Sequence, residues 1–143
     1  MEADVRIGVI GNGMVGEAVA AFWRERAEVR VYDVDPERSH GTWKEAASAD
    51  VVFVCVPTPA GEDGLDVGFL EAAVGALDSL YAEHELLGQV VIKCTVPPGT
   101  TGYLQAPHEH LALYHVPEFL SRATSAKDYA KPASIIIGSL RPC

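Results

Sequence analysis

Short runs rich in apolar residues alternate along this chain with segments in which apolar residues recur every three or four positions. The runs lie at residues 5–10, 29–32, 51–56, 89–94, 111–115 and 134–138. Runs of this length are typical of strands that are buried in a sheet, on both faces where the run is uninterrupted. The pattern therefore predicts about six strands.

Helical spacing fills the gaps between these runs. Residues 14–25 and 66–83 each carry an apolar stripe, and a short helical stretch is expected at 43–49. Strands that alternate with helices favour an α/β fold with a doubly wound, mostly parallel sheet of the Rossmann type and right-handed crossovers. No linker or repeat interrupts the pattern, so one compact domain is expected over residues 1–143.

The turn between the first strand and the first helix carries a dinucleotide-binding pattern. It reads Gly11, Asn12, Gly13, Met14, Val15, Gly16, which is GxGxxG. The first glycine permits a tight turn, the second lets the backbone approach a pyrophosphate, and the third lets the helix pack against the strand. Free N–H groups at the helix N-terminus favour phosphate binding. All six residues are predicted to bind the cofactor.

Asp33 completes this pattern at the end of the second strand, 22 residues after Gly11. A carboxylate there is expected to accept hydrogen bonds from the adenine ribose and to repel a 2′-phosphate, so the predicted cofactor is NAD rather than NADP. The alternative is a glycine turn in an α/β protein that binds another nucleotide, or none.

Polar segments follow three of the later strands, at residues 57–59, 95–101 and 117–120. Ligands of doubly wound sheets bind beyond the carboxyl ends of the strands, where the strand order reverses. The three segments are therefore predicted to face one crevice.

The sequences of these segments resemble a known family. VFVCVPTP ending at Pro59, KCTVPPGTT at 93–101, and VPEFL at 116–120 followed by Ala126, Asp128, Pro132 and IIIG are similar to the NAD-binding domain of the UDP-glucose and GDP-mannose 6-dehydrogenases. The similarity runs from about Val5 to Gly138. Members of that family oxidise an alcohol of a nucleotide sugar to the acid with two NAD, through intermediates linked to a cysteine.

The resemblance implies roles for individual residues. It adds to the cofactor-binding set Arg38, Val56, Pro57, Thr58, Cys94 and Thr95. It also implies that Thr95 lies near the nicotinamide and the catalytic water and that Glu118 lies at the reaction centre, as parts of an incomplete catalytic site. Taken alone, Thr95 equally suits a cap for the helix that Pro97 and Pro98 introduce, and Glu118 a solvated turn.

Departures from the family weaken the expectation of complete catalysis. The family continues beyond the position of Gly138 into dimerisation and sugar-nucleotide domains that carry its nucleophilic cysteine, and these are expected to be absent here. Arg122 stands where the family has a glutamate, and Val116 where it has asparagine or serine. The expected partners are NAD and a nucleotide sugar or a second polypeptide. The alternatives are half of a split dehydrogenase, a non-catalytic NAD-dependent sensing module, or a small reductase using Glu118 or Lys93.

Charge and cysteine content exclude other classes of function. With 11 Lys+Arg against 20 Asp+Glu the net charge is −9, which disfavours nucleic acid and anionic membranes as partners. Three cysteines without a CxxC motif favour a reducing compartment, and a cytoplasmic location is predicted. No metal site is predicted, because the histidines at 108 and 110 have no third ligand at a telling spacing.

Overall fold

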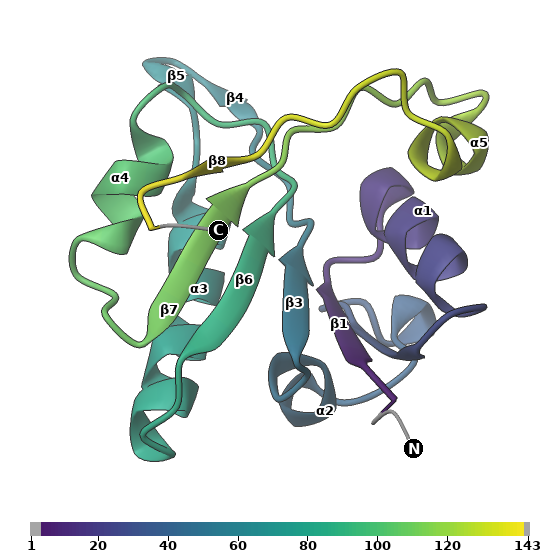
Figure 1. Ribbon diagram of the computed structural model, residues 1–143. Coiled ribbons are helices and arrows are strands. Elements are labelled where there is room, and N and C mark those ends of the chain that lie inside the picture. The colour runs from purple at the N-terminus through teal and green to yellow at the C-terminus, as the bar shows by residue number, and fades with distance from the viewer. Residues whose placement is uncertain (1–3, 142–143) are drawn as a thin grey trace.

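The computed structural model of the protein describes residues 4–141, and a six-stranded sheet of order β2-β1-β3-β6-β7-β8 forms its centre (Figure 1). The strands are β1 (Arg6–Ile10), β2 (Glu28–Tyr32), β3 (Val51–Val54), β6 (Gly88–Ile92), β7 (Leu111–His115) and β8 (Gly138–Ser139). The first five run parallel, and β8 pairs antiparallel with β7. The predicted doubly wound, mostly parallel α/β sheet is confirmed.

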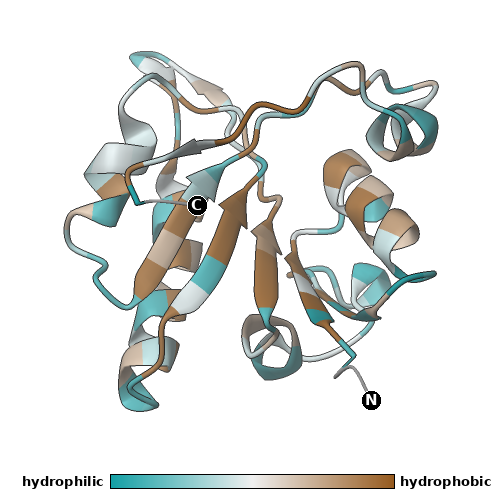
Figure 2. Ribbon diagram, in the orientation of Figure 1, coloured by the Kyte–Doolittle hydropathy of each residue, from teal (hydrophilic) through white to brown (hydrophobic). Residues whose placement is uncertain are grey.

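The helices pack on the two faces of this sheet in separate cores. They are α1 (Met14–Trp23), α2 (Trp43–Ala47), α3 (Gly68–Glu83), α4 (Thr100–Gln105) and α5 (Ser125–Ala130), with a 3-10 turn η1 (Pro36–Arg38). One core joins the sheet to α2, α3 and α4, and the other joins it to α1 and Tyr129 of α5. Figure 2 shows the apolar character of β1, β3, β6 and β7 on which both cores depend.

The predicted strand over residues 134–138 is wrong in its extent. The structure has only the two-residue β8 there, and it runs opposite to its neighbour. Ile135, Ile136 and Ile137 belong to no strand and are 67%, 54% and 56% exposed. An apolar run alone does not distinguish a buried strand from an extended surface segment, because burial depends on what packs against it.

Two further elements have no counterpart in the predictions. A small hairpin pairs β4 (Ala60–Gly61) with β5 (Gly64–Leu65), and α5 forms over the polar sequence SAKDYA. Neither carries a periodic apolar stripe. Among the described helices, none is long and apolar enough to cross a membrane.

Candidate cofactor-binding site

A groove of about 640 Å³ opens at the carboxyl ends of the parallel strands. It lies where the strand order reverses: β2 is on one side of β1, and β3 is on the other. The groove is lined by the loops that follow β1, β2, β3, β6 and β7, namely by Gly11, Gly13, Met14, Val15, Asp33, Val34, Asp35, Arg38, Cys55, Val56, Pro57, Thr58, Lys93, Cys94, Thr95, Glu118 and Arg122. Of the predicted site residues, only Asn12 and Gly16 are not part of the lining.

The three glycines of the turn serve three different geometric needs. Gly11 has φ +91°, and a Cβ there would lie 2.7 Å from the carbonyl oxygen of Cys55. A Cβ on Gly16 would lie 1.9 Å from the carbonyl oxygen of Gly11, so the helix packs directly against the backbone of the turn that follows β1. A Cβ on Gly13 would meet no heavy atom within 4 Å. Gly13 therefore borders open space in the groove, where a pyrophosphate fits.

The first turn of α1 adds hydrogen-bond donors beside that space. Its N-cap is Gly13, which has no side chain to accept from the N–H groups of the first turn. Uncapped N–H groups and the helix dipole together favour an anion at this position. The donor set and the bare backbone of Gly13 thus fit the phosphates of a dinucleotide.

Asp33 holds the turn together from the end of β2. Its Oδ2 accepts a hydrogen bond from the Asn12 N–H at 2.7 Å, and its Oδ1 accepts one from the Asp35 N–H at 2.8 Å. Each carboxylate oxygen has a second lone pair, so both can still accept from a ligand hydroxyl. Asn12 is not part of the groove lining, and its side-chain amide donates to the carbonyl of Arg38 at 2.7 Å.

Arg38 lies at the same end of the groove, on the 3-10 turn η1. Its Nε is 3.5 Å from Asp35 Oδ2, and both side chains are well exposed. An exposed pair of this kind is weak, so the guanidinium is free to exchange its partner for a ligand phosphate or hydroxyl.

The opposite wall consists of the loops after β3 and β6. Thr58 Oγ1 donates a hydrogen bond to the carbonyl of Thr95 at 2.7 Å and so ties the two loops together. Thr95 itself is exposed, and α4 begins only at Thr100 with Gly99 as its N-cap. The alternative in which Thr95 caps this helix is therefore wrong. Its side chain is available to the groove.

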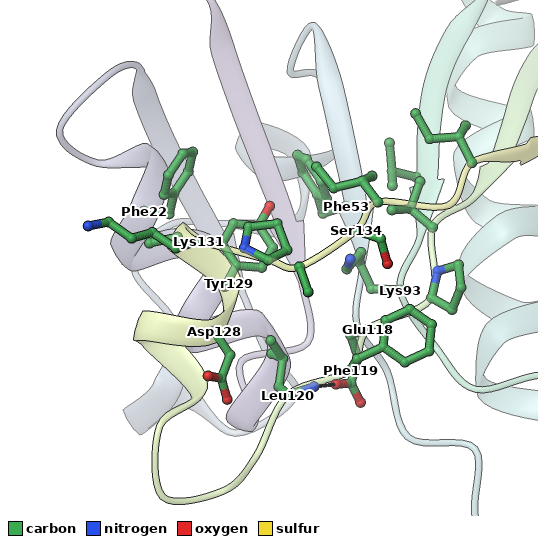
Figure 3. A pocket seen from close by; sticks show the side chains of 18 of the residues that line it. Phe22, Phe53, Lys93, Glu118, Phe119, Leu120, Asp128, Tyr129, Lys131 and Ser134 are labelled. Carbon is green, nitrogen blue, oxygen red and sulfur yellow. Dashed lines mark hydrogen bonds between the residues drawn. The ribbon is translucent and has the colours of Figure 1, made fainter.

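Glu118 enters the groove from the loop after β7. The residue is half-buried, and its Oε2 accepts a hydrogen bond from the Leu120 N–H at 2.6 Å (Figure 3). It is therefore not a fully solvated turn residue. The bond fixes the carboxylate beside the carboxyl end of β6.

Lys93 also lines the groove, although the sequence predicted a role for it only in the alternative of a small reductase. It is 6% exposed and borders the groove on one side and a second cavity on the other. Burial lowers the pKa of its ammonium, and the nearby Cys55 and Glu118 oppose that shift. The sequence gives one indication of this burial: Lys93 directly follows an apolar strand, and a residue in that position can be buried together with the end of the strand.

Neither described cysteine is suited to nucleophilic chemistry. Cys94 is 5% exposed, its Sγ donates to the carbonyl of Val54, and burial raises its pKa to about 11. Burial also raises the pKa of Cys55. Thiolate, not thiol, is the nucleophile, so both groups are inert at neutral pH. Within residues 4–141 no group of side chains has the composition of a metal site.

This protonation state predicts slow thiol modification. At pH 8 only roughly a thousandth of Cys94 is thiolate in the folded protein, whereas an unfolded cysteine is about one-quarter ionised. In a Cys143→Ser variant, we expect Ellman's reagent to modify the native thiols at least about a hundredfold more slowly than the same protein unfolded in guanidinium. Rapid release of two equivalents from the native protein would contradict this account.

The chain is similar to known proteins in sequence. Residues 38–142 match the model of the UDP-glucose/GDP-mannose dehydrogenase family, NAD binding domain. The chain is 25% identical to the UDP-glucose 6-dehydrogenase of Haloferax volcanii over 94% of its own length, and 32% identical to the GDP-mannose 6-dehydrogenase of Pseudomonas aeruginosa over 68%. The alignments cover 41% and 25% of these two relatives, respectively.

A solved structure has the same fold. The UDP-glucose dehydrogenase of Pyrobaculum islandicum superposes with a TM-score of 0.83 at 27% identity, over 97% of this chain and 41% of that one. The chain thus corresponds to less than half of the relatives it matches.

Proposed function

This chain belongs to the UDP-glucose/GDP-mannose dehydrogenase family as its NAD-binding domain, and we propose that the groove holds NAD with its pyrophosphate against Gly13 and its adenine ribose at Asp33. The observation that carries this proposal is the contrast among the three glycines: two are closed by backbone contacts, and Gly13 borders open space. Asp33 lines the groove, and each of its carboxylate oxygens accepts only one hydrogen bond from the described residues, so each retains a lone pair.

At the other end of the groove, the nicotinamide is proposed to lie among Val56, Pro57, Thr58, Cys94 and Thr95. NAD supplies the hydride acceptor when it is bound. In the proposal, the Thr95 hydroxyl holds a water molecule near this end. Glu118 Oε1, which accepts no hydrogen bond from residues 4–141, holds or moves a proton there.

These groups make an incomplete reaction centre in our proposal. Oxidation through a cysteine-linked intermediate needs a thiolate, and the pKa values of Cys55 and Cys94 are raised by burial. The contacts that bind the cofactor differ from those that stabilise the transition state, so NAD binding does not require the groups that catalyse the oxidation. Arg122 adds a positive charge at the groove, where the family has a glutamate.

We therefore expect this chain with NAD and either UDP-glucose or GDP-mannose to form no NADH. Absorbance at 340 nm is the measurement, and NAD binding to the same sample by calorimetry is the control that the groove is intact. A sustained rise proportional to protein concentration would show that the described residues suffice for the reaction.

A second candidate function is that of one half of a split enzyme, completed by another polypeptide. The observation that favours it is the exposure of large apolar side chains in the last part of the described chain: Phe119, Ile135 and Ile137 line one cavity, and Ile136 and Leu140 are also exposed. Exposed apolar side chains that gather at one cavity are typical of a protein contact. A nucleotide sugar would then bind only where the two polypeptides meet.

The role of Asp33 is tested by a matched pair of variants, Asp33→Asn and Asp35→Asn. Hydrogen bonds to charged groups contribute about 1.5–3 kcal/mol, so Asp33→Asn is expected to weaken NAD about tenfold or more and to reduce the preference for NAD over NADP. Asp35→Asn removes the same charge from the same loop, and we expect a change of less than about threefold. Calorimetric titrations with equal losses in both variants would contradict the direct ribose contact.

A further inference from the structure

Residues 94–95 form part of the groove wall but lie beyond the hydrogen-bond ladder of the sheet. Strand β6 ends at Ile92, whose register partner in β7 is His115. Cys94 and Thr95 lie past this end and line the groove. Within residues 4–141, neither of them takes part in a hydrogen bond between main-chain groups. Other contacts must therefore hold the main chain of this short segment in place.

Two side chains supply these contacts, one from each strand that flanks β6. His115, at the end of β7, has its ring Nε2 3.0 Å from the carbonyl oxygen of Cys94. A carbonyl oxygen can only accept, so Nε2 must carry a hydrogen and donate it. In the loop after β3, Thr58 Oγ1 donates to the carbonyl of Thr95 at 2.7 Å. Two consecutive carbonyls are thus held from the two sides of β6.

His115 holds the segment without lining the groove. The residue is half-buried at the end of β7 and is not among the groove residues. Among the described residues, the Cys94 carbonyl is the only hydrogen-bond partner of its ring. A substitution of His115 therefore leaves the composition of the groove lining unchanged. Any effect of that substitution on a bound ligand has to pass through residues 94–95.

We propose that His115 is a positioning residue for the nicotinamide half of the cofactor, and that it acts by holding the Cys94 carbonyl. The inference rests on the proposed function, in which Cys94 and Thr95 lie beside the nicotinamide. It adds to that function a residue outside the groove that determines affinity. Without the His115 bond, a ligand has to bring residues 94–95 into place as it binds, and this cost weakens binding.

Two ligands separate the two halves of the cofactor. ADP-ribose has the adenine, both riboses and the pyrophosphate of NAD but lacks the nicotinamide, so in our proposal it depends on Gly13 and Asp33 and not on residues 94–95. In calorimetric titrations we expect His115→Ala to weaken NAD about fivefold or more and ADP-ribose less than about twofold. A general loss of stability would instead affect both ligands alike.

His115→Gln should restore NAD affinity to within about threefold of the parent, because the glutamine amide can donate to the same carbonyl. His108→Ala is the matched control. The His108 ring donates from Nδ1 to the Leu104 carbonyl at 2.6 Å, but the residue lies outside the groove lining, so both affinities should stay unchanged. Equal losses for the two ligands in His115→Ala, no loss of either, or a His115→Gln variant as weak as His115→Ala would overturn the proposal.

A double variant tests whether the two side chains hold one segment together. Thr58→Val removes the second side-chain bond and keeps the shape of the side chain. Groups that hold the same segment are coupled, so Thr58→Val and His115→Ala combined should weaken NAD by less than the product of their separate effects. A loss equal to that product would mean that the two residues act independently, contrary to the proposal.

The parent chain keeps failure of this inference apart from failure of the proposed function. If the parent binds neither NAD nor ADP-ribose, the NAD site fails and the inference fails with it. If the parent binds both ligands equally tightly, the adenine and pyrophosphate contacts of the groove stand, and the role of His115 alone is overturned.

Discussion

Gly13→Val is expected to weaken NAD binding at least about a hundredfold while leaving the fold intact. A Cβ at this position meets no heavy atom within 4 Å, so the added side chain enters the groove without disturbing the protein. The residue has φ −80° and ψ −157°, an extended conformation that valine readily adopts. The free energy of unfolding should therefore change by no more than about 1 kcal/mol, the usual cost of a poor N-cap.

Calorimetric titration and thermal unfolding of the same samples check this result. Gly75→Ala is the control, since Gly75 lies in α3, is not among the groove residues, and its Cβ would have its nearest contact at 3.9 Å. That variant should bind NAD as the parent does. If Gly13→Val retained full affinity for NAD, the pyrophosphate would have to bind elsewhere and the groove assignment would fail.

Gly16→Ala is expected to have the opposite profile and to destabilise the fold by about 3 kcal/mol or more. Within a helix this substitution ordinarily stabilises by about 0.5–1 kcal/mol, because alanine loses less backbone entropy. Here the new methyl group would lie 1.9 Å from the carbonyl oxygen of Gly11, and a backbone atom cannot move aside as a side chain does. Helix α1 would have to move away from the turn that follows β1.

The measurement is thermal unfolding followed by circular dichroism, with a fall in melting temperature of about 10 °C or more expected. Gly75→Ala again serves as the reference, because it makes the same substitution in a helix that has room for it. A Gly16→Ala protein as stable as the parent would mean that helix and strand can separate without loss, contrary to the close packing described above.

Local patterns predict much of this molecule. The apolar runs predict the five parallel strands because each strand is buried by helices that lie next to it in the sequence. The GxGxxG turn predicts the groove because a strand, a tight turn and a helix are specified within a few residues. The antiparallel direction of β8 and the exposure of Ile135, Ile136 and Ile137 depend instead on long-range packing. No local sequence pattern predicts that packing.

Within the site, the burial of Lys93 likewise depends on long-range packing. Its burial arises from the loop after β7 and from Tyr129, which lies 36 residues further along the chain. A single lysine after a strand contains no information about those contacts. The raised pKa of Cys94 has a similar origin, because it follows from burial against the core of α3 and α4 rather than from its neighbours in sequence.

The Thr58–Thr95 hydrogen bond has a kinetic consequence. Together with the two bonds that Asp33 accepts, it fixes the loops at both ends of the groove through contacts within the protein. A cofactor that binds in such a groove does not have to order the loops that form the walls of the groove. The loss of conformational entropy on binding is therefore small. Association should follow a single concentration-dependent step, limited by encounter and orientation rather than by a slow closure of loops.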